Sequence, residues 1–361
     1  MMVEAGKKLK VVYLTRKWPP AVGGMETYSV ELTSELSGRV ELQTVYLPGR
    51  EGGATPAKSA LIGFFFKAVA AISKSKKVDV FHVGDMAMWP LALVSNILKP
   101  RSRSVISAHG TDVAFGIRPG LAPKVYNFYL KSGAVLLGRR TTVIANSTPT
   151  GGFCTAAGFR NVEVVPLGTF AKPTVSSAQV ATPKYVLYVG RLAVRKGLGW
   201  FVREVLPLLP NDITVKVAGS TWDSSELQAI ESNPRVSFLG PVYGDELANL
   251  RLGAIAVIMP NITLAGRDFE GFGLTAIEAS AVGAVLIASA VDGIVDAVRD
   301  GETGFLIAEG NPQKWADKIA EVNSWSPAER LAFVQKAQQV TRDYYSWSRV
   351  AEDCVRIYQQ V

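Results

Sequence analysis

Twelve short runs rich in Val, Ile, Leu and Ala, separated by intervals long enough for a helix, constrain the fold of this 361-residue chain more than any other feature. Such runs are typical of strands that are buried on both faces of a parallel sheet, with helices as the crossover connections. They form two sets of six, which cover residues 11–15, 40–46, 79–83, 104–108, 142–146 and 162–167, and then 185–189, 213–218, 236–239, 254–259, 284–288 and 304–307.

The interval between the two sets is rich in Pro, Thr, Ser and Ala, which is typical of a linker. The chain is therefore expected to be an α/β protein with two doubly wound Rossmann-like domains, at 1–168 and 185–345, joined by a linker at 169–184. Ligands of such sheets bind beyond the carboxyl ends of the strands. The loops after the apolar runs are therefore where functional residues are expected.

Charge is unevenly distributed along the chain. Residues 1–168 hold 21 Lys and Arg against 10 Asp and Glu, a net charge of +11, whereas the whole chain has +8. This asymmetry suggests an anionic partner or surface for the first half, with scattered solubilising lysines as the alternative. Two cysteines, Cys154 and Cys354, cannot form a disulfide framework and predict a reducing compartment. The polar first ten residues and the lack of a long apolar stretch predict neither signal peptide nor membrane span, hence a cytoplasmic protein.

An aromatic-rich helix is predicted within residues 56–78, because Phe64-Phe65-Phe66 is followed by Lys67, Lys74, Lys76 and Lys77. Such a helix can lie in a membrane interface and meet anionic headgroups, which would make the protein peripheral at the inner face of the membrane. A crossover helix packed on the sheet with a solvated basic end is an equally good interpretation.

The segment from Glu270 to Glu278 reads Glu-Gly-Phe-Gly-Leu-Thr-Ala-Ile-Glu and opens an Ala-rich helix. If that helix begins near Gly273, its first N–H groups and positive dipole end form a seat for a phosphate. Glu278 would then lie about one and a half turns into the helix, where a carboxylate can accept hydrogen bonds from vicinal hydroxyls. The motif predicts a phosphorylated, hydroxyl-rich ligand, and an ordinary glycine turn beside a solvated glutamate is the alternative.

Two further loops carry features that suit an anion. After the run 185–189, Arg191 offers a planar fork and Lys196 a mobile point charge, and both can converge on a diphosphate. After the run 11–15, Gly23 and Gly24 precede a predicted helix and allow a close approach to its backbone. The sequence of this loop does not match the Gly-x-Gly-x-x-Gly fingerprint of dinucleotide-binding folds, and a plain tight turn is the alternative interpretation.

The two histidines of the chain, His82 and His109, each lie near the end of a predicted strand. That position favours a functional role over a purely structural one. His109 is followed by Gly110, which suits a residue that contacts a ligand through its side chain and backbone.

Taken together, the run from Gly190 to Gly197, the Glu270–Glu278 motif, the Gly23-Gly24 loop, His109-Gly110 and Ser346-Trp347 resemble the family-4 retaining glycosyltransferases of the GT-B fold. The resemblance covers almost the whole chain. It implies two domains that face each other across a cleft, a final segment 346–361 that crosses back to the first domain, and transfer of a sugar from a nucleotide sugar with retention of configuration. It implies neither a cofactor nor a metal.

The resemblance also implies roles for single residues. Arg191 and Lys196 match residues on the donor diphosphate, as do Gly24 and the backbone of Phe272, Gly273 and Leu274. Glu278 resembles the ribose-binding glutamate, Glu270 the glutamate near the transferred sugar, and His109 the histidine that approaches that sugar. Val242 lies in the loop that resembles the nucleobase-binding one. The expected partners are a nucleotide-sugar donor, a glycan or lipid-linked acceptor and an anionic membrane surface, without nucleic acid.

One loop departs from the family pattern. Many relatives have Gly-Gly-x-x-Glu where this chain has Asp292-Gly293-Ile-Val-Asp296, so the identity of the donor stays open. Two other functions also stay open. A nucleotide-sugar epimerase shares the two-domain architecture but needs acid–base residues that are sparse here, and a non-catalytic nucleotide-sugar-binding protein would have the same binding residues.

Overall fold

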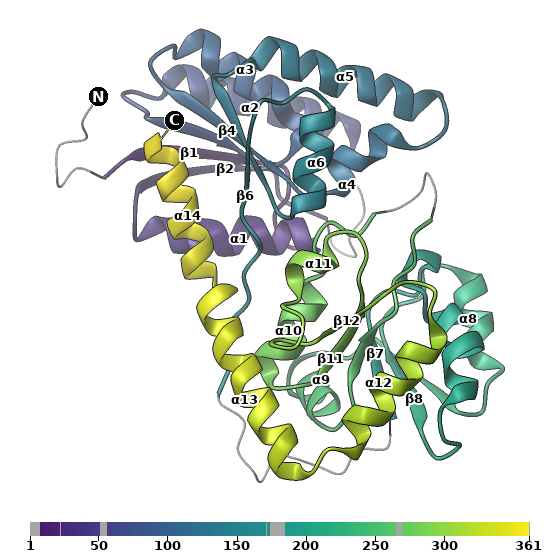
Figure 1. Ribbon diagram of the computed structural model, residues 1–361. Coiled ribbons are helices and arrows are strands. Elements are labelled where there is room, and N and C mark those ends of the chain that lie inside the picture. Colours follow the sequence, from purple (N-terminus) through teal and green to yellow (C-terminus); the bar gives the residue numbers. More distant parts are fainter. Residues whose placement is uncertain are drawn as a thin grey trace. The chain divides into compact units, whose positions relative to one another are not determined.

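The structure is a computed structural model, and it describes residues 8–21, 23–50, 56–170, 172–173, 185–264 and 269–360 (Figure 1). Its contacts divide the chain into two compact units. Unit 1 comprises Met1–Leu167 with Trp347–Val361, and unit 2 comprises Gly168–Ser346. Residues 171 and 174–184 of the predicted linker lie outside the described residues.

Unit 1 is built on a parallel sheet with the strand order β2-β1-β3-β4-β5-β6. The order reverses after β2, which makes the sheet doubly wound as predicted. All six predicted strands are present, as β1 (Lys10–Thr15), β2 (Glu41–Tyr46), β3 (Val80–Val83), β4 (Arg103–Ala108), β5 (Thr141–Ala145) and β6 (Asn161–Val164).

Helices cover both faces of this sheet (Figure 1). One face carries α1 (Gly24–Ser37) and α14 (Trp347–Gln360), which contact each other. The other carries α2 (Lys58–Lys74), α3 (Trp89–Leu98) and α5 (Leu121–Leu137), with the short α4 (Thr111–Ala114) and α6 (Thr148–Ala156) near the strand ends.

The position of α2 answers part of the question about the aromatic-rich segment. Phe64, Ala68 and Ile72 recur at i, i+4 and i+8 and are buried in the core, whereas Phe66 is 66% exposed. The helix is therefore a crossover packed on the sheet, and it ends at Lys74, before the last two lysines of the predicted segment. No helix in the part of the chain described here is long and apolar enough to cross a membrane.

A buried polar network joins α14 to the sheet of unit 1. The Nδ1 of His82 lies 2.6 Å from the hydroxyl of Tyr358, and its Nε2 lies 2.7 Å from the Oγ of Ser107. His82 is fully buried within β3. The functional role predicted for this histidine is therefore wrong, because both of its ring nitrogens have partners inside unit 1, one on α14 and the other on β4. Burial, with a smaller contribution from His109, lowers the pKa of His82 to about 3.

This lowered pKa predicts a loss of stability in acid. The unfolded chain binds a proton at His82 below about pH 6.5, whereas the folded chain does not until about pH 3, so protonation favours unfolding across that window. Between pH 7.5 and pH 5 this residue is expected to lower the free energy of unfolding by about 2 kcal/mol. Denaturant titrations of the wild type and of His82→Gln at both pH values measure it. Equal pH dependence in the two proteins would contradict the prediction.

Unit 2 repeats the architecture with the strand order β12-β11-β10-β7-β8-β9. Its six predicted strands are also present, as β7 (Tyr185–Val189), β8 (Thr214–Ala218), β9 (Val236–Gly240), β10 (Val257–Met259), β11 (Leu286–Ser289) and β12 (Phe305–Ile307). Its helices are α7 (Leu198–Trp200), α8 (Ser224–Glu231), α9 (Gly244–Leu252), α10 (Leu274–Val282), α11 (Ile294–Ala297), α12 (Pro312–Ser324) and α13 (Pro327–Tyr344).

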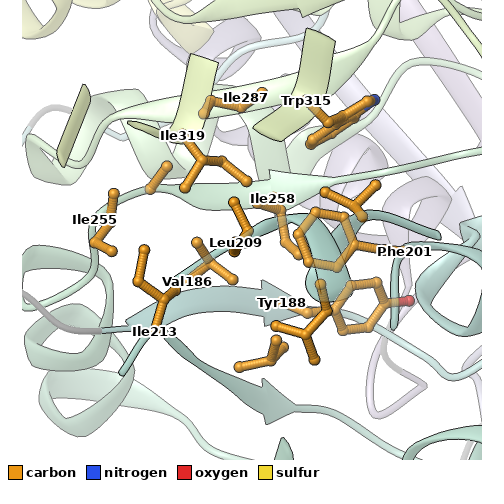
Figure 2. Packing of buried hydrophobic residues seen from close by; sticks show 14 of the residues in the cluster. Val186, Tyr188, Phe201, Leu209, Ile213, Ile255, Ile258, Ile287, Trp315 and Ile319 are labelled. Carbon is orange, nitrogen blue, oxygen red and sulfur yellow. The ribbon is translucent and has the colours of Figure 1, made fainter. Parts of the chain in front are cut away.

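The core of unit 2 is apolar on the face shown in Figure 2. Val186, Tyr188 and Ile258 come from neighbouring strands, and Phe201 and Trp315 pack over them from the helices, with the two rings edge to face at 5.7 Å. This rigid layer fixes the ends of β7 and β10, from which the candidate site is built.

Candidate functional site

The candidate site of unit 2 lies at the carboxyl ends of β7 and β10, which are neighbours in the sheet. The loop after β7 makes one short 3₁₀ turn, Val194–Lys196, and then passes through Gly197 with a φ of 69°. A Cβ on Gly197 would lie 1.9 Å from the carbonyl oxygen of Pro260. Only glycine therefore allows the loop to lie against the chain that follows β10. The N–H of Ile262 donates to the carbonyl of Arg195 at 2.9 Å and closes this contact.

The turn brings two cations to Glu270. The Nη1 of Arg195 lies 2.6 Å from its Oε2, and the Nζ of Lys196 donates to the same oxygen. All three side chains are mostly buried, at 12%, 15% and 15% exposure for Arg195, Lys196 and Glu270. Burial raises the pKa of the Glu270 carboxyl, but Lys196 and Arg195 outweigh burial and leave the pKa at about 2. Glu270 is therefore an anion at every physiological pH.

The loop after β11 fixes the backbone at Glu270. The N–H of Glu270 donates to the Oδ2 of Asp292 at 3.0 Å, and the N–H of Gly293 donates to the carbonyl of Glu270 at 2.9 Å. Asp292 has a φ of 51°, a conformation that Asp tolerates better than most residues. In this chain the loop that departs from the family pattern thus uses a carboxylate to hold the segment at the site.

Helix α10 begins where the sequence predicted. Gly273 precedes it with a φ of 98°, and Leu274 is its first residue. The N–H groups of a first helical turn have no acceptor within the helix, and they add to the positive end of the helix dipole. This N-terminus follows Glu270 by four residues. The segment that ends in this helix N-terminus thus also carries the carboxylate that the ammonium of Lys196 and the guanidinium of Arg195 contact. A helix end together with these two cations suits phosphate oxygens.

Glu278 lies further along α10 and is paired with a residue of α9. The Nη2 of Arg251 donates to its Oε2 at 2.7 Å. The side chain of Arg251 is 8% exposed and that of Glu278 is 44% exposed. The buried guanidinium therefore holds a carboxylate that solvent, and so a ligand, can still reach.

The remaining predicted residues of unit 2 are more dispersed. The exposed guanidinium of Arg191 lies 4.9 Å from the ring centre of Trp222, which is 70% exposed, so Arg191 stacks on an aromatic ring after β8. The side chain of Phe272 is buried and lies edge to face with Tyr345 at 6.2 Å, which leaves its backbone as the candidate contact. Val242 is half-buried in the loop between β9 and α9.

In unit 1, His109 directly follows β4 and is held in one orientation. Its Nε2 lies 2.9 Å from the carbonyl oxygen of Gly84, which can only accept, so Nε2 carries a proton. The backbone N–H of His109 donates to Asp112 at 2.8 Å, and its ring packs edge to face on Tyr28. Gly24 is the first residue of α1, so the helix N-terminus predicted at this glycine is present.

The sequence reasoning missed four side chains of unit 2. Arg195 and Asp292 hold Glu270, Arg251 holds Glu278, and Asn261 lies buried beside Glu270 with its Nδ2 3.5 Å from Oε2. The Oδ1 of Asn261 has no hydrogen-bond partner in the described ranges. Three of the four had a signal in the sequence, since Arg195 adjoins Lys196, Asp292 opens the loop that departs from the family pattern, and Asn261 follows a buried strand by two residues.

Two family models match the chain. The family described as "Glycosyl transferases group 1" matches residues 183–324, and the family described as "Glycosyltransferase Family 4" matches residues 22–169. The chain belongs to the family-4 glycosyltransferases. The family predicted from the motifs is confirmed.

Relatives found by sequence agree with this assignment. The chain is 29% identical over 182 residues to an uncharacterized glycosyltransferase of Methanocaldococcus jannaschii, with 49% of this chain and 45% of the relative covered. It is 32% identical over 188 residues to the D-inositol 3-phosphate glycosyltransferase of Salinispora tropica, with 48% and 37% covered. The chain therefore matches less than half the length of these relatives.

Two solved structures share the fold over nearly the whole chain. The first is Anabaena HepE in complex with UDP and glucose, with a TM-score of 0.71, 17% identity, and 98% of this chain and 100% of that one covered. The second is sucrose-phosphate synthase of Thermosynechococcus elongatus, with a TM-score of 0.71, 20% identity, and 97% and 98% covered. The predicted fold class, two doubly wound Rossmann-like units of the GT-B type, is confirmed.

Proposed function

We propose that this protein is a retaining glycosyltransferase that moves a sugar from a nucleotide-sugar donor to a hydroxyl of a glycan or lipid-linked acceptor. The observation that carries the proposal is the cluster of Lys196, Arg195 and Glu270 beside the N-terminus of α10, in a chain of the family-4 glycosyltransferases. HepE, which shares the fold, has been solved with UDP-glucose. UDP-glucose is therefore the first donor to test.

In this proposal Lys196 and Arg191 bind the donor diphosphate together with the N–H groups at Gly273 and Leu274. The ammonium of Lys196 has three N–H groups, and its bond to Glu270 uses one of them. Arg191 gives up its stacking on Trp222 when it turns toward a phosphate. Gly24 serves the same diphosphate from unit 1.

Glu278 binds the ribose hydroxyls, and Val242 lies in the loop that binds the base. The pairing with Arg251 supports the role of Glu278, because it orients the carboxylate while 44% of the side chain stays exposed. Glu270 contacts hydroxyls of the transferred sugar and stabilises the positive charge that develops at the anomeric carbon. Its fixed negative charge suits that task. His109 contacts the same sugar from unit 1.

The chemistry needs no strong nucleophile from the protein. The acceptor hydroxyl forms the new bond to the anomeric carbon on the face from which the diphosphate departs, and the departing phosphate oxygen takes the hydroxyl proton. The cations around the diphosphate stabilise its growing negative charge. We place this reaction in cell-surface polysaccharide or glycolipid synthesis. We place the protein in the cytoplasm, because Cys154 and Cys354 are buried and form no disulfide, as is usual in a reducing compartment.

The proposal is tested by two measurements on the full chain. A panel of nucleotide sugars, beginning with UDP-glucose, is screened by thermal shift, and the donors that raise the melting temperature are then incubated with glycan and lipid-linked acceptors. We expect nucleotide release that depends on acceptor, and a glycosidic product with the donor's anomeric configuration by NMR. A nucleotide sugar converted to its epimer without acceptor would favour an epimerase. Binding without any turnover would favour a non-catalytic binding protein.

A further inference from the structure

Helix α5 (Leu121–Leu137) has an apolar side that faces solvent. Five large apolar side chains on it are 57–81% exposed: Leu121, Val125, Phe128, Val135 and Leu136. Their spacing places them on one side of the helix, and we call this set the α5 ridge. Ile117, which precedes the helix, is 59% exposed as well. A helix that is apolar on both its inner and its outer side is normally covered on both.

The inner side of α5 is firmly docked, so the ridge is not a face that could simply turn inward. The hydroxyl of Tyr126 donates to the carbonyl of Asp112 at 2.7 Å, and that of Tyr129 donates to the carbonyl of Ala87 at 2.8 Å. Gly133 packs so closely on the indole of Trp89 that an added Cβ would lie 2.8 Å from the ring. The fold therefore presents the α5 ridge to the outside as a fixed surface.

Charge around the ridge has one sign. Helices α2, α3 and α5, which cover the same face of the unit 1 sheet, contain five lysines and neither Asp nor Glu (Figure 1). On α5 itself, the exposed Lys124 and Lys131 flank the ridge, and Arg139 and Arg140 follow its end. The opposite face differs, because α1 contains Glu26, Glu31 and Glu35 and no Lys or Arg. Among the helices of unit 1, a net positive charge thus lies on the face that carries the ridge.

We propose that the α5 ridge docks unit 1 onto an anionic lipid bilayer. The ridge side chains would enter the interface between headgroups and acyl chains, and the lysines beside them would meet lipid phosphates. A second copy of the chain fits less well, since a two-fold pairing of ridges would bring Lys124 and Lys131 of both copies together. This assigns membrane contact to α5 rather than to the helix at 56–78 that the sequence suggested, and it does not depend on the chemistry of unit 2.

Vesicle co-sedimentation of the full-length protein tests the proposal. We expect binding to vesicles of phosphatidylcholine with 30% phosphatidylglycerol to exceed binding to pure phosphatidylcholine by about tenfold, and to weaken at 0.5 M NaCl. Val125→Ser combined with Phe128→Ser is expected to lower binding to the anionic vesicles by at least about tenfold. Both positions are exposed, so the melting temperature should stay within about 2 °C of the wild type.

The matched control is Ile62→Ser combined with Phe66→Ser, two exposed positions on α2 at 59% and 66% exposure. This variant is expected to change binding less than twofold. A loss of binding in the α2 variant but not in the α5 variant would overturn the assignment to α5. If the wild type did not bind vesicles, the proposal that the ridge docks on a bilayer would be refuted. If the α5 variant then changed the oligomeric state in size-exclusion chromatography, a second copy of the chain would be identified as the occupant of the ridge.

Discussion

Replacement of Lys196 by methionine is expected to lower kcat/KM by about 10²–10³-fold, the range found when one group that stabilises transition-state charge is removed. Methionine keeps most of the apolar stem but removes the ammonium that donates to Glu270 and, in our proposal, to the departing diphosphate. Glu270 keeps its contact with Arg195 at 2.6 Å, so the loop should remain folded. Steady-state kinetics with the donor found in the thermal-shift screen measure the effect.

Two further variants show where the effect originates. Glu270→Gln keeps the shape of the side chain but removes its charge, and it should lower kcat more than it changes the affinity for UDP, because its charge matters as the sugar departs. Lys314→Met removes an exposed lysine of α12 and should change kcat/KM less than twofold. Near-normal transfer by both Lys196→Met and Glu270→Gln would refute the site.

The strands could be predicted from the sequence because strands that are buried in a parallel sheet are continuous apolar runs. The prediction was less accurate at their ends. The run 254–259 contains only Val257–Met259 as strand, although the chain just before it already bonds to β7: the N–H of Ile255 donates to the carbonyl of Tyr185 at 2.8 Å. The burial of Phe64 was also within reach, because Phe64, Ala68 and Ile72 follow a helical period.

Other features depend on contacts between distant parts of the chain. The side chain of His82 contacts that of Tyr358, which lies 276 residues away in the sequence. No local sequence pattern predicts that contact. Arg251 is a similar case, since it reaches Glu278 from the preceding helix. Arg195 and Lys196 are neighbours, but only the 3₁₀ turn at Val194–Lys196 directs both side chains to one carboxylate. The motifs thus indicated the segments of the candidate site, and tertiary structure decided which side chains meet.

Gly293→Ala is expected to have the second large effect, although the residue contributes no side chain. Gly293 has ordinary dihedral angles, with φ −73° and ψ −5°, so alanine is acceptable to its own backbone. An added Cβ, however, would lie 2.1 Å from the carbonyl oxygen of Gly271 and 2.8 Å from the nitrogen of Phe272. The segment that carries Glu270 must therefore move away from the loop after β11.

That movement acts on the chemistry because the same segment sets Glu270 against Lys196 and Arg195 and leads into α10. A displacement of about 1 Å can lower kcat/KM by about 10²-fold, and the steric strain should lower the free energy of unfolding by about 1–3 kcal/mol. Kinetics and denaturant titration measure the two effects. Gly38→Ala is the matched control, since Gly38 has nearly the same dihedral angles, φ −78° and ψ −21°, and its Cβ would meet nothing within 4 Å. If the two glycine variants behaved alike, close packing of the loop on Glu270 could not be what positions the site.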